Sequence, residues 1–127
     1  LRKEKDSATS IEKLTLKKME DWKADIWALS PPCQPHTRQH SNQEADLEDP
    51  RSKSFLHLCD LIEKMTDSAL PQLILLENVV GFEESNSCKR FRLALAKRSF
   101  TYRPLKLVFQ TIDLGTFAWQ FACKNLK

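Results

Sequence analysis

Glycine is nearly absent from this sequence. Only two of the 127 residues are glycines, Gly81 and Gly115. Loops that cradle phosphates or dinucleotides need several glycines, because their backbone must approach the ligand closely. Such a loop cannot be built from these residues. Apolar side chains nevertheless make up 41% of the chain, which is enough for the core of one small domain.

Membrane and metal signals are also missing. No apolar run is long enough to span a bilayer, and no segment has the pattern of a secretory signal. The four cysteines, Cys33, Cys59, Cys88 and Cys123, lie far apart without a Cys-x-x-Cys pair. This spacing argues against a zinc site and against a disulfide scaffold. The sequence predicts a folded protein that needs no metal or membrane, located in the cytoplasm or the nucleus.

Positive charge is in only slight excess. The formal net charge of +3 does not by itself indicate a nucleic-acid-binding protein. One run, CKRFRLALAKR, concentrates cations. At helical spacing Phe91 and Leu95 share one face of this run, while Lys89, Arg92 and Lys97 turn elsewhere. The run is therefore interpreted as a helix with a solvated basic face.

Three segments have the spacing of amphipathic helices. The first, which Thr15 is suited to cap, places Leu16, Met19 and Trp22 on one side. The second has Asp49 as its N-cap and a proline directly after it, at the first helical position, where the missing N–H costs nothing. The predicted helices cover residues 16–22, 50–65 and 85–98, and the second should bury Phe55, Leu58, Cys59, Ile62 and Met65.

Three apolar runs outside the predicted helices are predicted to form strands. DIWALS and QLILLENVVGF are continuous apolar runs of the kind found in the strands of a buried parallel sheet. The strand predicted within the second run ends in Glu77 and Asn78. FTYRPLKLVFQ is a third strand, with Pro104 at an edge or a bulge. Helices and strands therefore alternate, which predicts an α/β sheet with crossover helices.

Chemically useful side chains follow the first two predicted strands. Cys33 lies in a proline-rich loop after the first strand, and Glu77 and Asn78 end the second. Parallel sheets bind ligands at the carboxyl ends of their strands, so a thiol and a carboxylate converge if these strands are neighbours. A thiolate there can be a nucleophile and a carboxylate can hold a proton. Taken singly, a packed cysteine or a capping glutamate would be the ordinary alternative.

Three motifs together resemble the C5-cytosine methyltransferases. SPPCQPHTRQ and ILLENVVGFEES are similar to the family's Pro-Cys-Gln and Glu-Asn-Val motifs, and DPRSKSFLHLCDLI lies between them. The details are closest to the branch that is similar to DNA methyltransferases but modifies aspartate tRNA. The likeness extends from about Ser10 to Gly115. It implies a partial Rossmann-like sheet of the type that uses S-adenosylmethionine.

The resemblance assigns chemistry to three residues. The Cys33 thiolate would add to C6 of a flipped-out cytosine and make C5 able to accept a methyl group. Glu77 would hold or protonate the N3 edge of that base, and Asn78 would support the loop that aims Glu77. Cys59, Cys88 and Cys123 would be structural.

The resemblance also implies the ligands. S-adenosylmethionine is the expected cofactor, contacted by Ser30, Ile11 and Glu12. Gln34 and Arg38 are expected to contact the substrate, which would be a cytosine in the anticodon loop of aspartate tRNA, with DNA as the alternative.

The sequence departs from the family pattern at both ends. Residues 1–115 are interpreted as a partial catalytic domain without the glycine-containing cofactor loop and without a target-recognition domain. Residues 116–127 are interpreted as a divergent tail, because no arginine follows Arg103 where the family has an arginine-bearing motif. The chain opens in LRKEKD without an initiator methionine, so we expect a fragment. Two interpretations remain open: a methyltransferase, or an inactive truncated isoform that acts at most as a binding module.

Overall fold

The fold is a mixed sheet covered on one face by helices. The computed structural model describes residues 9–31, 50, 52–79, 81–109 and 116–125, and from residue 104 onward only their backbone. The elements in chain order are η1 (Ile11–Lys13), α1 (Leu16–Trp22), β1 (Ile26–Leu29), α3 (Lys53–Lys64), η2 (Asp67–Ala69), β2 (Leu73–Val79), η3 (Phe82–Glu84), α4 (Asn86–Lys97), β3 (Phe100–Phe109) and β4 (Thr116–Asn125).

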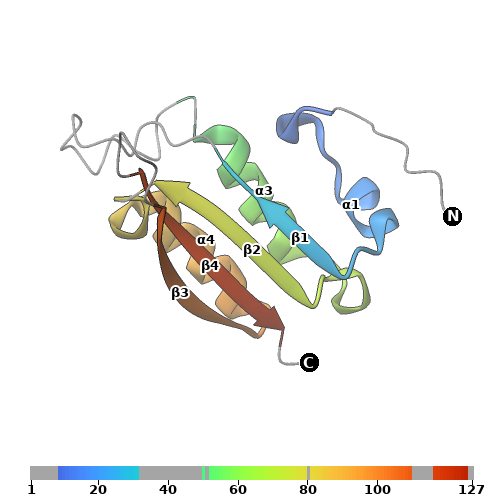
Figure 1. The fold of residues 1–127 in the computed structure, drawn as a ribbon. Coiled ribbons are helices and arrows are strands. Elements are labelled where there is room, and N and C mark those ends of the chain that lie inside the picture. The colour runs from blue at the N-terminus through green and yellow to red at the C-terminus, as the bar shows by residue number, and fades with distance from the viewer. Residues whose placement is uncertain (1–8, 32–49, 51, 80, 110–115, 126–127) are drawn as a thin grey trace, which may run out of the picture.

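The strands are arranged in the order β1-β2-β4-β3. β1 and β2 are parallel neighbours, and β4 is antiparallel to both β2 and β3. β1, β2 and β3, which are the three predicted strands, therefore all run in the same direction, and β4 runs opposite to them. α3 and α4 lie behind the sheet, and α1 lies near β1 (Figure 1). This arrangement confirms the predicted α/β sheet with crossover helices.

The core forms between the sheet and the two long helices. Successive side chains of a strand point to opposite faces of the sheet, so that Ile74 and Leu76 of β2 are buried while Leu75 between them is exposed. Phe55 of α3 packs against Phe91 of α4, with ring centroids 5.4 Å apart. Burial of one such side chain stabilises the fold by roughly 1.5–3 kcal/mol. All the α3 residues expected in the core are buried: Phe55, Leu58, Cys59, Ile62 and Met65.

Local signals explain the helix ends, with one exception. The Thr15 hydroxyl accepts a hydrogen bond from the Lys18 N–H, and the Ser85 hydroxyl accepts one from the Cys88 N–H. The predicted start of α3 was wrong, because the helix begins at Lys53. A turn precedes it, in which the Pro50 carbonyl accepts from the Lys53 N–H at 3.4 Å. The proposed cap, residue 49, lies outside the described residues.

Two findings concern the far edge of the sheet. β3 forms that edge, so Pro104 lies on an edge strand as predicted, where a missing N–H is tolerated. β4 lies within residues 116–127, which the sequence analysis treated as a divergent tail without a strand. It pairs with β2 from Leu73 to Val79 and with all of β3. The last strand of the chain is therefore central to the sheet.

Candidate active site

The candidate site lies where the parallel pairing of β1 with β2 ends. Leu29 pairs with Leu76 in the parallel register, so the next residues, Ser30 and Glu77, stand opposite each other. The Ser30 hydroxyl donates a hydrogen bond of 2.7 Å to Oε2 of Glu77. Oε1 of Glu77 has no hydrogen bond within the described part of the chain. Ser30 thus holds one of the two carboxylate oxygens of Glu77.

Asn78 connects the end of β2 with the residues after β1. Its side chain is only 2% exposed. Its Nδ2 donates to the Pro31 carbonyl at 3.4 Å, and its Oδ1 accepts from the Val79 N–H at 2.8 Å. Because a buried amide is costly to leave unpaired, these bonds fix the side chain. The sequence analysis did not identify the Pro31 carbonyl as a partner, although its position directly after a parallel strand is a usable signal.

Three predicted residues lie outside the described part of the chain. They are the proposed nucleophile Cys33 and the proposed substrate contacts Gln34 and Arg38. Pro31, the last described residue before them, is held by Asn78. Pro31 therefore lies beside the end of β2, as the neighbouring strands require. The roles of these three residues remain predictions.

The other predicted cofactor residues lie in η1. The Glu12 carboxylate accepts a hydrogen bond of 3.0 Å from the Ser54 hydroxyl at the start of α3. Ile11 is half-buried and packs against the core. His57 of α3 lies 2.9 Å from the carbonyl of Leu14, which follows η1. α3 thus fixes η1, and within the described part of the chain no hydrogen bond or ion pair joins Ile11 or Glu12 to the Ser30–Glu77 pair. Sequence reasoning missed Ser54, whose position at the first turn of a helix after β1 was the available signal.

Buried thiols elsewhere are unsuited to nucleophilic chemistry. Burial raises the pKa of Cys59 to about 12 and that of Cys88 to about 11. Both therefore stay protonated at neutral pH, and both lie in the core. This agrees with the structural role expected for them.

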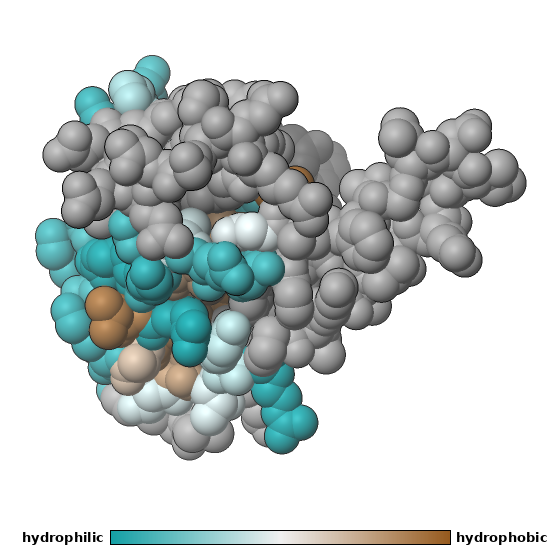
Figure 2. All heavy atoms as spheres, turned by 90° about the vertical axis from the view of Figure 1, so that its left-hand side faces the viewer, coloured by the Kyte–Doolittle hydropathy of each residue, from teal (hydrophilic) through white to brown (hydrophobic). Residues whose placement is uncertain are grey.

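The described surface on one side of the molecule is partly polar. Figure 2 looks from the left-hand side of Figure 1 and shows, among the described residues, hydrophilic side chains with a smaller hydrophobic area beside them. Among the described residues no group of three or more histidine, cysteine or acidic side chains could hold a metal ion. None of the helices in the described ranges has the length and apolarity needed to cross a membrane.

Comparison with known sequences identifies a family. The profile of the C-5 cytosine-specific DNA methylases matches residues 2–108. A DNA (cytosine-5)-methyltransferase from Dictyostelium discoideum is 35% identical over 94% of this chain. A human tRNA (cytosine(38)-C(5))-methyltransferase is 37% identical over 79% of it. The matches span 31% and 25% of the length of these relatives, respectively.

Solved structures of the same kind have this fold. The S. pombe Dnmt2 methyltransferase matches 94% of this chain with a TM-score of 0.74 and 27% identity. The Entamoeba histolytica methyltransferase EhMeth matches 98% of this chain with a TM-score of 0.84 and 26% identity. This chain covers 34% and 39% of those two chains, so the likeness concerns one part of each.

Proposed function

Because the chain belongs to the C5-cytosine methyltransferase family, we propose that its gene product transfers a methyl group from S-adenosylmethionine to C5 of a cytosine in tRNA. The substrate we propose is the anticodon loop of aspartate tRNA. The observation that carries the proposal is the pairing of the Ser30 hydroxyl with the Glu77 carboxylate where the parallel pairing of β1 with β2 ends. It gives Glu77, the acid of the family's chemistry, a fixed orientation beside Ser30, which precedes Cys33 by three positions in the sequence.

Covalent attack begins the proposed reaction. The Cys33 sulfur forms a bond to C6 of the flipped cytosine, and the electron pair of the C5–C6 double bond moves toward C5 and the N3 edge. A protonated Glu77 donates a hydrogen bond or its proton to N3 as this charge develops. Once C5 carries the methyl group, a base removes the C5 proton, the electron pair of that C–H bond re-forms the C5–C6 double bond as the sulfur leaves C6, and N3 returns to Glu77 any proton it took. The cysteine is thereby restored.

Two neighbours orient the acid and the nucleophile. Ser30 holds Oε2 of Glu77, which leaves Oε1 to face the base. Asn78 holds the Pro31 carbonyl, two residues before Cys33, and so links the two motifs directly. Fixed donors and acceptors are effective because they need little reorganisation during the reaction.

The residues of η1 suit a nucleoside-containing cofactor. Glu12 is exposed, and its carboxylate is already oriented by Ser54, so it can accept hydrogen bonds from ribose hydroxyls. The half-buried Ile11 offers an apolar contact for an adenine ring. S-adenosylmethionine supplies an electrophilic methyl group when it is bound. The chain's own residues bind it, orient it and hold the acid.

RNA is favoured as the substrate by the sequence between the two motifs, which resembles the tRNA-modifying branch. Several relatives are named as tRNA methyltransferases, for example those of humans and Schizosaccharomyces pombe. DNA is the alternative substrate, and the experiment below separates the two.

The decisive experiment measures methyl transfer by the protein expressed from its gene's complete coding sequence. Tritiated S-adenosylmethionine is offered with unmodified aspartate tRNA or with duplex DNA. We expect label in the tRNA. Cys33→Ala should lose at least about a thousandfold in rate, since the adduct at C6 cannot form. Glu77→Gln should lose roughly a hundredfold or more.

Cys88→Ala is the matched control, because this thiol is buried and protonated at neutral pH. It should retain most of the activity of the parent. The proposal fails if Cys33→Ala methylates tRNA at the parental rate, or if only DNA is labelled. The 127 residues by themselves should transfer little or no methyl, because they include no glycine-rich cofactor loop.

A further inference from the structure

A second surface lies away from the strand ends, between α4 and β3. It is a groove of about 470 Å³ lined by Lys89, Arg92, Leu93, Leu95, Ala96, Phe100 and Tyr102. Leu95 and Phe100 belong to the core and are 1% and 7% exposed, so they give the groove an apolar floor. The proposed methyl-transfer chemistry uses none of these seven residues.

The outer wall of the groove is also apolar. Leu93 projects from α4 with 60% of its surface exposed, although the neighbouring turns of this helix bury their leucine and phenylalanine side chains. Ala96, one turn later, is exposed as well. Covering Leu93 and Ala96 would remove apolar surface from water, which favours binding of an apolar side chain here.

The cations of α4 fall into two groups. Arg90, Lys97 and Arg98 each form an ion pair with an acidic residue of α3 or η2. Lys89 and Arg92, which line the groove, have no carboxylate partner within the described part of the chain. The side of α4 that meets α3 is thus neutralised, while the side along the groove keeps two positive charges.

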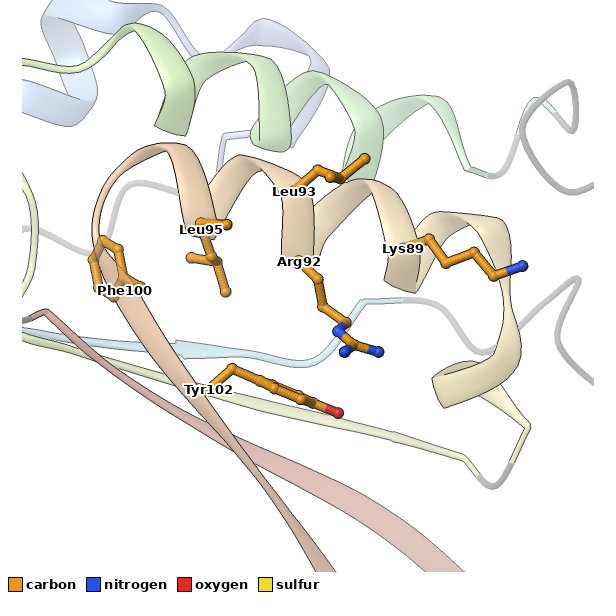
Figure 3. A pocket seen from close by; sticks show the side chains of 7 residues that line it. Lys89, Arg92, Leu93, Leu95, Phe100 and Tyr102 are labelled. Carbon is orange, nitrogen blue, oxygen red and sulfur yellow. The ribbon is translucent and has the colours of Figure 1, made fainter.

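Arg92 also determines which kind of anion suits the groove. Its guanidinium lies over the ring of Tyr102, 4.7 Å from the centroid (Figure 3). That face of the ring is therefore already covered, and a nucleic-acid base cannot stack on it. Two of the described residues that line this largely apolar depression are cations. This combination fits an apolar side chain with acidic neighbours better than a phosphate backbone.

We propose that the groove between α4 and β3 binds an acidic peptide segment of a partner protein. The segment inserts a leucine, phenylalanine or tryptophan side chain against Leu93, Leu95 and Phe100. Aspartate or glutamate residues on either side of this anchor pair with Lys89 and Arg92. The proposal does not depend on methyl transfer, because the groove shares no residue with the candidate active site.

The experiment starts from a phage-displayed library of random dodecapeptides, selected on the immobilised 127-residue chain. The double variant Lys89→Gln/Arg92→Gln is present in solution as a competitor. We expect enriched sequences with an aromatic or leucine anchor and at least two acidic residues within four positions of it. The synthetic consensus peptide, labelled with fluorescein, is then titrated by anisotropy.

Variants of the groove test which of its residues bind the peptide. The double variant should bind the peptide at least about tenfold more weakly, because both charge contacts are lost. Leu93→Ser should weaken binding about threefold or more, since an exposed residue can be changed without loss of the core. Lys17→Gln, an exposed lysine of α1, is the matched control and should bind like the parent.

Amide chemical shifts locate the bound peptide and report that each variant is folded. The shifts of Leu93, Ala96 and Tyr102 should move on titration. Enrichment of peptides without acidic residues would overturn the proposal, and so would equal binding by the double variant. Displacement of the peptide by a uridine dodecanucleotide that shifts the same amides would assign the groove to nucleic acid and would also contradict it.

Discussion

A single hydroxyl controls the orientation of the Glu77 carboxylate. Ser30 donates to Oε2 at 2.7 Å, and both residues stand one position beyond the last pair between β1 and β2, although β2 itself continues to Val79. A free carboxylate at a strand end can rotate about its side-chain bonds, whereas a bonded one presents Oε1 in one direction. Ser30 is thus a positioning residue in the proposed reaction. Its predicted contact with the cofactor remains a separate prediction.

Ser30→Ala should lower the kcat of tRNA methylation about tenfold, because the lost hydrogen bond to a carboxylate is worth roughly 1.5 kcal/mol. The KM for tRNA should change little, because the Ser30 hydroxyl bonds to Glu77 within the site and does not contact the described surface around the site. Steady-state kinetics with tritiated S-adenosylmethionine measures both parameters.

Two further variants test whether the lost hydroxyl causes this effect. Ser30→Thr keeps a hydroxyl and should restore most of the lost rate. Ser68→Ala removes an exposed hydroxyl in η2 and should have no effect. A parental kcat in Ser30→Ala would show that Glu77 needs no such support.

At the scale of elements, charged side chains join α3 to α4 along their solvent side. Glu63 of α3 accepts hydrogen bonds from Lys97 at 2.9 Å and from Arg90, and Arg90 also contacts Asp60. The hydrogen bond from Lys97 and the charge of Arg90 hold the pKa of the Glu63 carboxyl below its usual range. The lowered pKa predicts a pH-dependent contribution to stability.

Glu63→Gln tests this contribution. A carboxyl whose pKa is lowered by folding stabilises the fold above its unfolded pKa, and this stabilisation is lost as the pH falls through the folded pKa. The difference in unfolding free energy between the parent and Glu63→Gln should therefore be largest near pH 7 and shrink between about pH 5 and pH 3. Urea denaturation at several pH values measures it. Glu84→Gln, an exposed control, should show no such trend, and a constant difference for Glu63→Gln would contradict the prediction.

The elements differ, for physical reasons, in how well their boundaries could be predicted from the sequence. α4 and β2 were predicted within a residue or two, because Ser85 is a strong cap and an apolar run ending in polar residues marks a buried strand. The start of α3 was wrong because a proline that suits the first helical turn also suits a preceding turn. β4 was missed although Phe117, Trp119 and Phe121 alternate, because the segment was judged only by its departure from the family pattern.

The candidate site was predictable only as far as strand adjacency could be assumed. The sequence placed Cys33 and Glu77 after two strands, but a local pattern cannot say which strands are neighbours. The parallel pairing of β1 with β2 supplied that information. The contacts of Ser30 with Glu77 and of Asn78 with Pro31 join residues 47 positions apart, and nothing local encodes such distances.

For the whole molecule, β4 decides whether the sheet is continuous. It pairs with seven residues of β2 and with all ten of β3. Removal of residues 116–127 would therefore leave an unpaired edge on each of these strands, and exposed edges promote aggregation. The shortened chain should lose its cooperative thermal transition and elute as aggregates in size-exclusion chromatography.

Removal of residues 126–127 alone is the control, because β4 ends at Asn125. That chain should unfold like the parent. A monomeric, cooperatively melting chain without residues 116–127 would show that β2 and β3 do not need the strand between them.

The position of β4 also sets the order of events during synthesis. The ribosome makes β1, β2 and β3 before β4, but β4 is the strand that fills the gap between β2 and β3. The nascent chain therefore carries two open strand edges until residues 116–125 have left the exit tunnel. Chaperones that bind extended, apolar backbone would meet this protein in that interval, when β3 is exposed and β4 is still enclosed.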